Sequence, residues 1–255
     1  MFGFPKADYI IYKRNFLRKV IFQLDFKKNQ KIIENEDFLK SIFINDFPRF
    51  IKAQGNGLQI TFGNEKPKME TLNETENFIF KSQDGQTIIE INDRNIRLSF
   101  DNEGYKSSND IRKVLNLFND FLKNNIDELE KISLKKINIV EFDNESNPNG
   151  VLYFLLNKNV IGNMDSFPNT NLINHNLQSV NYKSEEFLLN LKYGMNIPPI
   201  QNLKIGQVII DIEISKHTKT NLIDVQNVFE EINAEIFNVF NSLINDNTKN
   251  ILNGN

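Results

Sequence analysis

The chain has 255 residues, of which 40% are hydrophobic and 25% are charged, and its formal net charge at pH 7 is −3. These values are ordinary for a globular protein, and the length suffices for one large domain or two closely joined halves. The charge balance gives no bulk electrostatic reason to expect a nucleic-acid or membrane partner. Cysteine is absent, which excludes disulfides, thiolate metal sites and a cysteine nucleophile.

The first sixteen residues do not have the pattern of a secretion signal. Their apolar run is short and is interrupted by Lys6 and Asp8, whereas a signal peptide has an uninterrupted apolar core. No apolar run in the chain approaches the ~18 residues that a membrane-spanning helix needs. We therefore expect a cytoplasmic bacterial protein with no membrane partner.

The N-terminal part of the sequence predicts alternating strands and helices. In Leu17–Phe26, every second residue from position 20 onward is apolar, so these residues point to one side, which is typical of a half-buried strand. A helix is predicted over 36–47, capped by Asn35 and stopped by Pro48. A glycine turn at 55–57 and a short strand at 58–62 follow, and the polar residues 63–76 indicate an exposed connection.

The next segment predicts an antiparallel meander followed by a long helix. Apolar residues alternate over 78–80, 89–91 and 96–100, and turn signals lie between these runs at Asp84-Gly85 and at 92–95. Ser108 is placed to cap the helix, whose apolar residues follow the i, i+3, i+4, i+7 spacing. A further strand is predicted over 134–142.

The second half of the sequence begins after a break rich in Asn, Pro and Gly at 143–150. Strands are predicted over 151–157, 179–182, 186–193 and 206–215, and the stretch 158–178 has no clear pattern. A last helix is predicted over 221–244, with a continuous apolar stripe along its length.

These elements predict an α+β fold: antiparallel meander sheets, each covered by a long amphipathic helix. Each half ends its meander with one such helix, so the sequence predicts two architecturally similar halves, residues 1–146 and 147–255, joined in one compact unit. The βαβ alternation of a doubly wound fold is absent.

Three residues near the end of the second half form a weak catalytic candidate. Asp211 and Glu213 lie two apart on a predicted strand, and Lys216 follows them, which faintly resembles the acidic pair and lysine of metal-dependent nucleases. In such nucleases the lysine follows the second acid by two residues, and Ser215 occupies that position in this chain. The structural interpretation is favoured, because the alternation places the neighbouring isoleucines in the core and both carboxylates in water.

A basic cluster near the N-terminus is the candidate for nucleic-acid binding. It consists of Lys13, Arg14, Arg18 and Lys19, with Tyr9, Tyr12 and Phe16 interleaved. Cations and aromatic rings together bind single-stranded nucleic acid through phosphate contacts and base stacking. The structural alternative is a solvated flank of the first strand, and the net charge favours it.

Other catalytic and ligand-binding patterns are missing from the sequence. Glycine-rich phosphate loops and a Gly-x-Ser-x-Gly elbow are absent, and His175 and His217 lie apart with no paired ligand motif. We therefore expect no metal and no cofactor. The two long helices are broadly apolar: Leu117, Ala234 and Phe237 widen their stripes, which indicates either a deep core or a surface for a partner.

Several segments together resemble a sporadically distributed family of uncharacterised bacterial proteins of about this length. The segments are PKADYIIYKRNFLRKVIFQLDF, INDRNIRLSFDNEGYKSSNDIRKVLNLFNDFL, LKKINIVEFDN and AEIFNVFNSLINDNTKNIL, in that order. The chain departs from the family where Ser99-Phe100 replaces a frequent Asn-Trp and Asn233-Ala234 replaces a frequent Leu-His. The resemblance supplies no catalytic residue. The family's patchy distribution implies an accessory gene, as in antiphage or toxin–antitoxin loci.

The sequence thus favours a non-catalytic protein that binds a partner protein, a second copy of itself included, in a bacterial defence or toxin–antitoxin locus. One alternative is a nucleic-acid-binding protein or a divergent metal-dependent nuclease. The other alternative is a small-molecule-binding α+β domain, which a large apolar cavity under the helix at 108–123 would favour.

Overall fold

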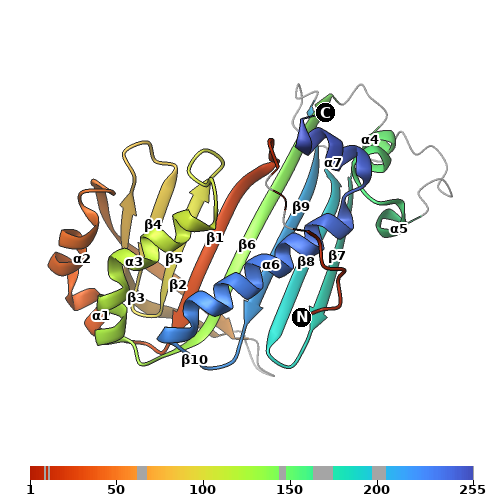
Figure 1. The fold of residues 1–255 in the computed structure, drawn as a ribbon. Coiled ribbons are helices and arrows are strands. Elements are labelled where there is room, and N and C mark those ends of the chain that lie inside the picture. Colours follow the sequence, from red (N-terminus) through yellow and green to blue (C-terminus); the bar gives the residue numbers. More distant parts are fainter. Residues whose placement is uncertain are drawn as a thin grey trace. The chain divides into compact units, whose positions relative to one another are not determined.

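The computed structural model describes residues 1–8, 10, 12–61, 68–143, 148–162, 175–196 and 205–254. Within these ranges the chain is an α+β protein with a large antiparallel sheet and several helices, which confirms the predicted class (Figure 1). None of the described helices is long and apolar enough to cross a membrane.

The chain divides into two compact units, each assembled from segments that are distant in sequence. Unit 1 contains Met1–Ile21, Ser133–Thr218 and Gln226–Asn255, and unit 2 contains Phe22–Ile132 and Lys219–Val225. The predicted boundary between residues 146 and 147 remains a prediction, and residues 144–147 lie outside the described ranges.

The described residues form these strands: β1 (Leu17–Phe26), β2 (Arg49–Thr61), β3 (Lys68–Lys81), β4 (Thr87–Ile91), β5 (Asn95–Asp101), β6 (Glu128–Asp143), β7 (His175–Lys183), β8 (Phe187–Asn196), β9 (Ile205–Lys216) and β10 (Thr220–Asn221). They form these helices: α1 (Lys31–Glu34), α2 (Glu36–Phe43), α3 (Ser108–Asn125), α4 (Pro148–Leu155), α5 (Lys158–Ile161), α6 (Val225–Leu243) and α7 (Asp246–Asn253). The predicted strand Leu17–Phe26 is found with the same bounds.

The strands of unit 2 follow one another in space as β2, β3, β4 and β5, each antiparallel to the next. Phe80 lies opposite Ile89, and Ile89 lies opposite Leu98. All three side chains are completely buried, because successive residues of a strand point to opposite faces and these share one face. The alternation seen in the sequence therefore builds one wall of the core of unit 2.

Aromatic rings fill the core of unit 2. The completely buried Phe43 of α2 lies with its ring centroid 5.0 Å from that of Phe80 and 5.7 Å from that of Phe118 on α3. Its ring also meets Phe47 edge to face at 6.0 Å. With no tryptophan in the chain, phenylalanine supplies the large planar side chains that hold α2 and α3 against β3.

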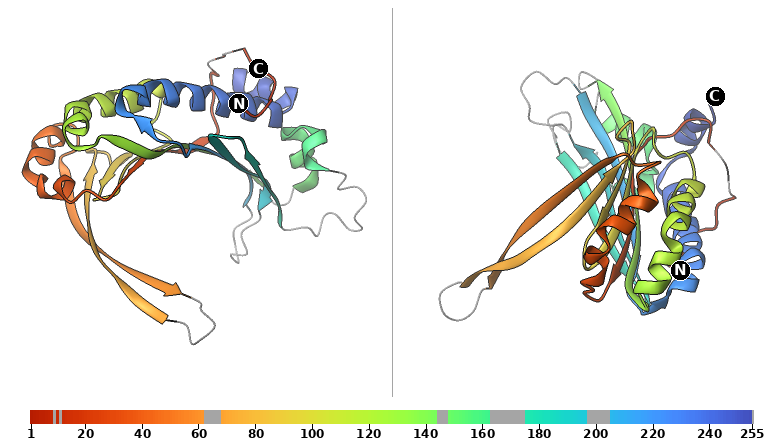
Figure 2. Two further views of the ribbon diagram at one scale, coloured as in Figure 1. Left: turned by 90° about the horizontal axis from the view of Figure 1, so that it is seen from below. Right: turned by 90° about the vertical axis from the view of Figure 1, so that its left-hand side faces the viewer.

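The prediction was wrong for the segments that form β2 and β3. Gly55 and Gly57 lie inside β2 at a shift of register, not in a turn, and the paired strands run from Arg49↔Lys81 to Thr61↔Lys68. The predicted exposed connection therefore belongs to β3 from Lys68 onward, and residues 62–67 lie outside the described ranges. Polar composition misled the prediction, because backbone pairing between two strands needs no apolar side chains. Figure 2 shows the pair as a long hairpin.

Two predicted helix caps differ from those in the structure. Asn35 does not cap α2 through its side chain; its Nδ2 donates to the Lys31 carbonyl at 2.7 Å, because a short helix α1 precedes it. α2 also ends at Phe43, before the predicted residue 47. The cap of α3 is Ser107, one residue before the predicted Ser108, in a reciprocal capping box with Asp110.

Replacing Ser107 with alanine is expected to lower the free energy of unfolding by about 1 kcal/mol, because one amide at the start of α3 loses its acceptor. Urea unfolding followed by circular dichroism measures this change. Ser108→Ala is the matched control and is expected to leave the free energy of unfolding unchanged or to raise it by about 0.5 kcal/mol or less, because alanine has the higher helix propensity. Equal losses for the two variants would contradict the assignment of the cap.

In unit 1, β8 pairs with β7 on one side and with β9 on the other, antiparallel in both cases. Leu191 lies opposite Ile212, and both are buried together with the alternating residues of their strands. β7 lies at one end of the strand order, and most of its residues are exposed. The predicted strands over 179–182 and 206–215 fall within β7 and β9, and the one over 186–193 begins one residue before β8.

The strand predicted over 151–157 was wrong, because Pro148–Leu155 forms helix α4. Leu152, Leu155 and Leu156 are buried while Phe154 is exposed, which is the i, i+3, i+4 spacing of a helix face. A short continuous apolar run cannot be assigned to a strand or a helix by periodicity alone. Length would also have favoured a strand here, because α4 has only eight residues.

The last predicted helix corresponds to α6, which begins at Val225 after β10 and a 3₁₀ turn over Leu222–Asp224. α7, which the sequence analysis did not separate from the C-terminal residues, begins after Asn245, whose side chain accepts from the amide of Thr248 at 3.0 Å. Asn245 Nδ2 also donates to the carbonyls of Tyr153 and Phe154. One asparagine therefore caps α7 and ties it to α4 within unit 1.

Candidate functional site

The N-terminal segment of unit 1 lies along α6 and bonds to a row of polar side chains on that helix. The Phe2 amide donates to Glu235 Oε1 at 2.9 Å, and the Ala7 amide donates to Asn238 Oδ1 at 3.0 Å. The Tyr12 hydroxyl donates to Asn241 Oδ1 at 2.6 Å. The three acceptors are spaced three residues apart and so share one face of the helix.

The N-terminal segment packs against part of the wide apolar stripe of α6. The ring of Tyr12 lies 6.2 Å from that of Phe237, and the Arg14 amide donates to the Leu252 carbonyl of α7 at 3.0 Å. Phe237 is only partly exposed. Of the two residues that widen the stripe of α6, Phe237 therefore packs against the N-terminal segment of its own chain, whereas Ala234 remains exposed.

A small apolar pocket of about 150 Å³ lies where this segment, β6, α6 and α7 meet. Its walls are mostly aromatic and aliphatic, and its polar groups come from the N-terminal segment and from two residues of β6. The residues that line it are Tyr12, Arg14, Asn15, Phe16, Leu17, Lys136, Asn138, Ile236, Phe237, Phe240 and Leu252. All of them belong to unit 1.

Lys136 is the distinctive residue of this pocket. Its ammonium group donates to Asn233 Oδ1 of α6 at 2.7 Å, and its side chain keeps some exposed surface where it borders the pocket. Burial among protein atoms lowers its pKa from the ordinary 10.5 to about 8, because removal from water disfavours the charged form. Lys136 therefore carries its charge at neutral pH in a mostly apolar environment and releases its proton readily.

The lowered pKa of Lys136 makes stability depend on pH. Between pH 8 and 10.5 the unfolded chain binds more protons at this residue than the folded chain does. The free energy of unfolding contributed by Lys136 therefore rises with pH across that window and has its lowest value below pH 8. An amine buried at this free-energy cost is a candidate for function, since perturbed ionisable groups cluster at functional sites.

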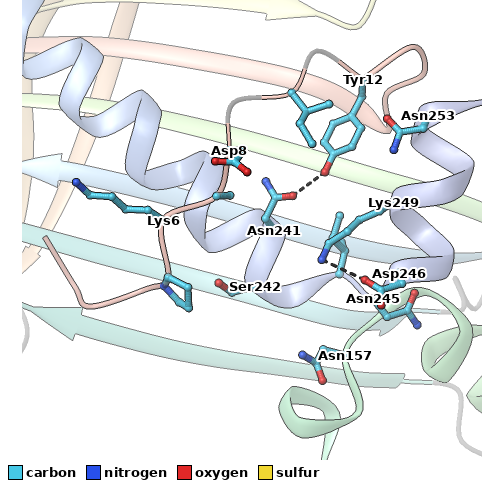
Figure 3. Close-up of a pocket in the computed structure, with 14 residues that line it drawn as sticks. Lys6, Asp8, Tyr12, Asn157, Asn241, Ser242, Asn245, Asp246, Lys249 and Asn253 are labelled. Carbon is cyan, nitrogen blue, oxygen red and sulfur yellow. Dashed lines mark hydrogen bonds and ion pairs between the residues drawn. The ribbon is translucent and has the colours of Figure 1, made fainter.

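A larger and more polar hollow of about 570 Å³ lies beside the same segment (Figure 3). Lys249 pairs with Asp246 at 3.4 Å inside it, and the Tyr12–Asn241 hydrogen bond forms part of its wall. Its remaining polar lining residues come mostly from the N-terminal segment, α6 and α7 and include Lys6, Asp8 and Asn253, and Asn157 at the start of α5 also lines it. Its charged groups come in both signs, so it selects for no ligand charge.

The candidate nuclease residues lie on β9, but they do not meet. Asp211 and Glu213 share one face of the strand, and Asp211 pairs with Lys135 of β6 at 2.9 Å. Lys216, an odd number of residues away, projects from the opposite face. It pairs with Glu186 at 3.4 Å and lies over the Phe187 ring at 5.6 Å. Within the described ranges, no group of three or more acidic or histidine side chains is placed to hold a metal ion.

The candidate nucleic-acid residues lie at the start of β1 and just before it. Arg18 pairs with Glu141 at 3.6 Å, and Lys13 and Arg14 are exposed. Lys19 is partly buried. Tyr12 and Phe16 line the apolar pocket, so these rings pack against the protein; Tyr9 lies outside the described residues. The cluster therefore has exposed cations beside rings that are already in contact with α6.

Lys136 was not predicted as a site residue, although the sequence contains a usable signal for it. The predicted strand over 134–142 contains Lys135 and Lys136 side by side, and successive residues of a strand point to opposite faces. If one face of that strand was solvated, one of the two lysines had to point toward the core. The structure shows this arrangement: Lys135 pairs with Asp211, and Lys136 turns toward α6.

The fold and site define an α+β protein with a lysine-bearing apolar pocket beneath an N-terminal segment. No family model matches the chain. No curated protein matches it either. The resemblance to the sporadic bacterial family remains a prediction from the quoted segments.

Proposed function

We propose that the chain is a non-catalytic protein that binds a partner protein through a surface on α2 and α3 of unit 2. The observation that carries the proposal is the exposure of large apolar side chains there. Phe38 of α2 is 50% exposed and Leu117 of α3 is 40% exposed. Exposed apolar residues that adjoin one another indicate an interaction site more strongly than scattered ones do.

The two residues belong to one surface. The ring of Phe38 stacks on that of Phe121 at 5.7 Å, with an interplanar angle of 28°. Leu117 lies four residues before Phe121 on α3, about one turn away along the helix, which has a non-helical residue, Phe118, between them. Phe121 itself is buried, so we call the two exposed residues near it, Phe38 and Leu117, the α2–α3 patch. Because stacking on Phe121 already restricts the ring of Phe38, binding of a partner would cost little further conformational entropy there.

The charges near the α2–α3 patch suggest the chemistry of the partner. Asp37 precedes Phe38, and Asp120 follows Leu117 by three residues; both are exposed. Lys113, four residues before Leu117, is exposed as well, so a complementary surface would present apolar side chains flanked by charges of both signs. We place such a partner in a bacterial defence or toxin–antitoxin locus, in line with the family resemblance. We also propose that the chain consists of two halves of similar architecture, each with a long helix over a meander.

Leu117→Glu is expected to weaken partner binding at least tenfold and to change the melting temperature little, because an exposed apolar residue is exchanged for a charge beside Asp120. Affinity purification from the native host identifies the partner, and titration of the purified partner measures the affinity of each variant. Ile223→Glu is the matched control, because Ile223 is 81% exposed on a different element.

Light scattering on the purified chain tests whether the partner is a second copy. A dimer that Leu117→Glu dissociates would support self-association through the patch. Unchanged affinity for both Leu117→Glu and Phe38→Glu, or a monomer that recovers no partner, would overturn the proposal.

The nucleic-acid alternative draws on the exposed Lys13 and Arg14. Its aromatic component is weaker, because Tyr12 and Phe16 face the pocket. Filter binding of single-stranded DNA and RNA at rising salt is the test, since phosphate contacts give a strong salt dependence. Salt-sensitive retention that Lys13→Ala and Arg14→Ala abolish would favour this alternative over partner binding.

A further inference from the structure

We propose that strand β7 of unit 1 pairs antiparallel with β7 of a second copy of the chain, about a two-fold axis that passes through Ser179. The pairing joins the β7 edges of two copies through backbone hydrogen bonds and involves no covalent step. It uses a surface separate from the α2–α3 patch of unit 2, and it does not depend on the partner protein proposed there.

β7 is an edge strand without the features that usually protect such edges. It pairs with β8 on one side, and none of the described strands pairs with it on the other (Figure 1). With nine residues, it is longer than a typical strand of about five or six. It contains no proline, and its one lysine, Lys183, is its last residue. Proteins prevent edge-to-edge pairing with short edges, prolines or charges, so this edge is a template for another strand.

Alternate residues of β7 direct their backbone groups away from β8. The Ser184 amide donates to the Phe187 carbonyl at 2.9 Å, and this pair continues the register in which Lys183 lies opposite Leu188. Hydrogen-bonded and non-hydrogen-bonded pairs alternate along an antiparallel ladder. The even-numbered residues of β7 therefore bond to β8, and the amides and carbonyls of its odd-numbered residues point outward.

The outward backbone groups are available to a second strand. Leu177, Ser179 and Asn181 are exposed, and no hydrogen bond from the described part of the chain reaches their outward amides or carbonyls. The edge also presents large apolar side chains, since Leu177 is 37% exposed and Tyr182, on the other face of the strand, is 38% exposed. A second strand would therefore bond to the outward groups and cover apolar surface while the β7–β8 ladder stays intact.

The geometry of the edge fits a second copy of β7. A two-fold axis perpendicular to the sheet relates the two strands antiparallel, and it must pass through a residue because opposed side chains share a face. Ser179 is the middle residue of His175–Lys183, so an axis there aligns the whole strand with its copy and places Leu177 opposite Asn181. Since the odd-numbered residues point outward, Ser179 forms a hydrogen-bonded pair with itself, and the two strands exchange about ten backbone hydrogen bonds.

The charges of β7 also suit a copy of itself. The strand contains no aspartate or glutamate, and residues 176–182 are all uncharged. A charged peptide would find no opposite charge along this stretch, whereas an identical strand meets no like charge there. His175 lies opposite Lys183 of the second copy only at the two ends of the paired strands. The uncharged middle therefore favours backbone pairing between identical strands.

Sedimentation velocity on the full chain is expected to show a dimer with a dissociation constant on the order of 10 µM or tighter. Ser179→Lys is expected to weaken this dimer at least tenfold, because two like charges then lie directly opposite each other. Lys192, which lies opposite Ser179 on β8, adds to the repulsion. The melting temperature of each variant shows that the fold is kept.

An equimolar mixture of Ser179→Lys and Ser179→Glu is expected to recover the dimer, because opposite charges then meet at the axis. Asn181→Lys is the matched control, since position 181 is on the same face of β7 but lies opposite Leu177 of the second copy. It is expected to weaken the dimer less than threefold.

The absence of cysteine from the chain allows a direct test of the register. Ser179→Cys is expected to cross-link to its own copy with a short bifunctional thiol reagent, because the Cβ atoms of opposed residues lie about 5 Å apart. The two copies of Asn181→Cys would lie about 14 Å apart along the strands and are not expected to react with each other. A mixture of Asn181→Cys with Leu177→Cys is expected to cross-link.

A dimer that Ser179→Lys weakens and Leu117→Glu leaves unchanged would support the proposal and separate it from the α2–α3 patch. A chain that stays monomeric at about 100 µM would overturn it and leave the edge to a strand of another protein. A dimer that Leu117→Glu dissociates and Ser179→Lys does not would overturn it as well. Cross-linking of Asn181→Cys to itself in place of Ser179→Cys would contradict the axis.

Discussion

Replacing Phe43 with alanine is expected to lower the free energy of unfolding of unit 2 by about 3–5 kcal/mol, the range for removing a large aromatic side chain from a core. Phe43 is completely buried and contacts the rings of Phe47, Phe80 and Phe118. These neighbours come from the turn after α2, from β3 and from α3. They cannot all move into the space that the ring leaves, so a cavity remains.

Urea unfolding, followed by circular dichroism, measures this effect. Phe38→Ala is the matched control, because it removes the same ring from the same helix at a position that is 50% exposed. It is expected to cost about 1 kcal/mol or less. Equal losses for the two variants would mean that α2 is not held by the aromatic core described above. A loss of only about 1 kcal/mol for Phe43→Ala would point to the same conclusion.

Replacing Gly194 with alanine is the second change with a large expected effect, about 3–5 kcal/mol in unit 1. Gly194 has a φ of +138°, and a Cβ there would lie 1.9 Å from the carbonyl oxygen of Asn176 on β7. Both the backbone conformation and the close approach of β7 exclude a side chain. The expected response is separation of the edge strand β7 from β8 around the Leu177↔Gly194 pair.

The variant Gly162→Ala distinguishes the effect of backbone strain from that of the steric clash with β7. Gly162 also has a positive φ, +76°, but a Cβ there would meet no atom within 4 Å. It is expected to cost about 1–3 kcal/mol from backbone strain alone. Thermal unfolding gives the overall change, and hydrogen exchange of the β7 amides shows whether the edge strand opens. Unchanged protection of β7 in Gly194→Ala would contradict the close approach.

The sequence predicts the parts of the fold in which one face of an element is buried. β1 has the predicted bounds because Val20, Phe22 and Leu24 are buried and alternate with residues that keep some exposed surface, so the alternation has a direct physical cause in burial. β4, β5 and α3 follow for the same reason. Prediction fails where side chains do not decide the backbone: at Gln54↔Glu76, Gly55↔Thr75 and Gln59↔Glu70, β2 and β3 pair through residues that are polar or glycine.

The candidate site shows a different limit. Asp211 and Glu213 are easily noticed in the sequence, yet the structure leaves Lys216 on the other face of β9. Lys136 looks like an ordinary surface lysine in the sequence, and only the position of α6 and the N-terminal segment makes it part of a pocket. The residues that form this pocket are as far apart as Tyr12 and Leu252, and no local pattern encodes such proximity. The wide apolar stripe of α3 indicated either a deep core or a surface for a partner, and the structure shows that Leu117 is exposed.

The discontinuous composition of unit 1 also has a consequence for how the chain folds during synthesis. Phe22–Ile132, which makes up most of unit 2, leaves the ribosome as one block, whereas the N-terminal segment must wait for α6. The bond between Tyr12 and Asn241 closes a separation of 229 residues, and contacts between such distant residues form late and slowly. Residues 2–16 thus remain undocked on the nascent chain until α6 and α7 have emerged. Chaperones would therefore have their longest access to the segment from Phe2 to Phe16.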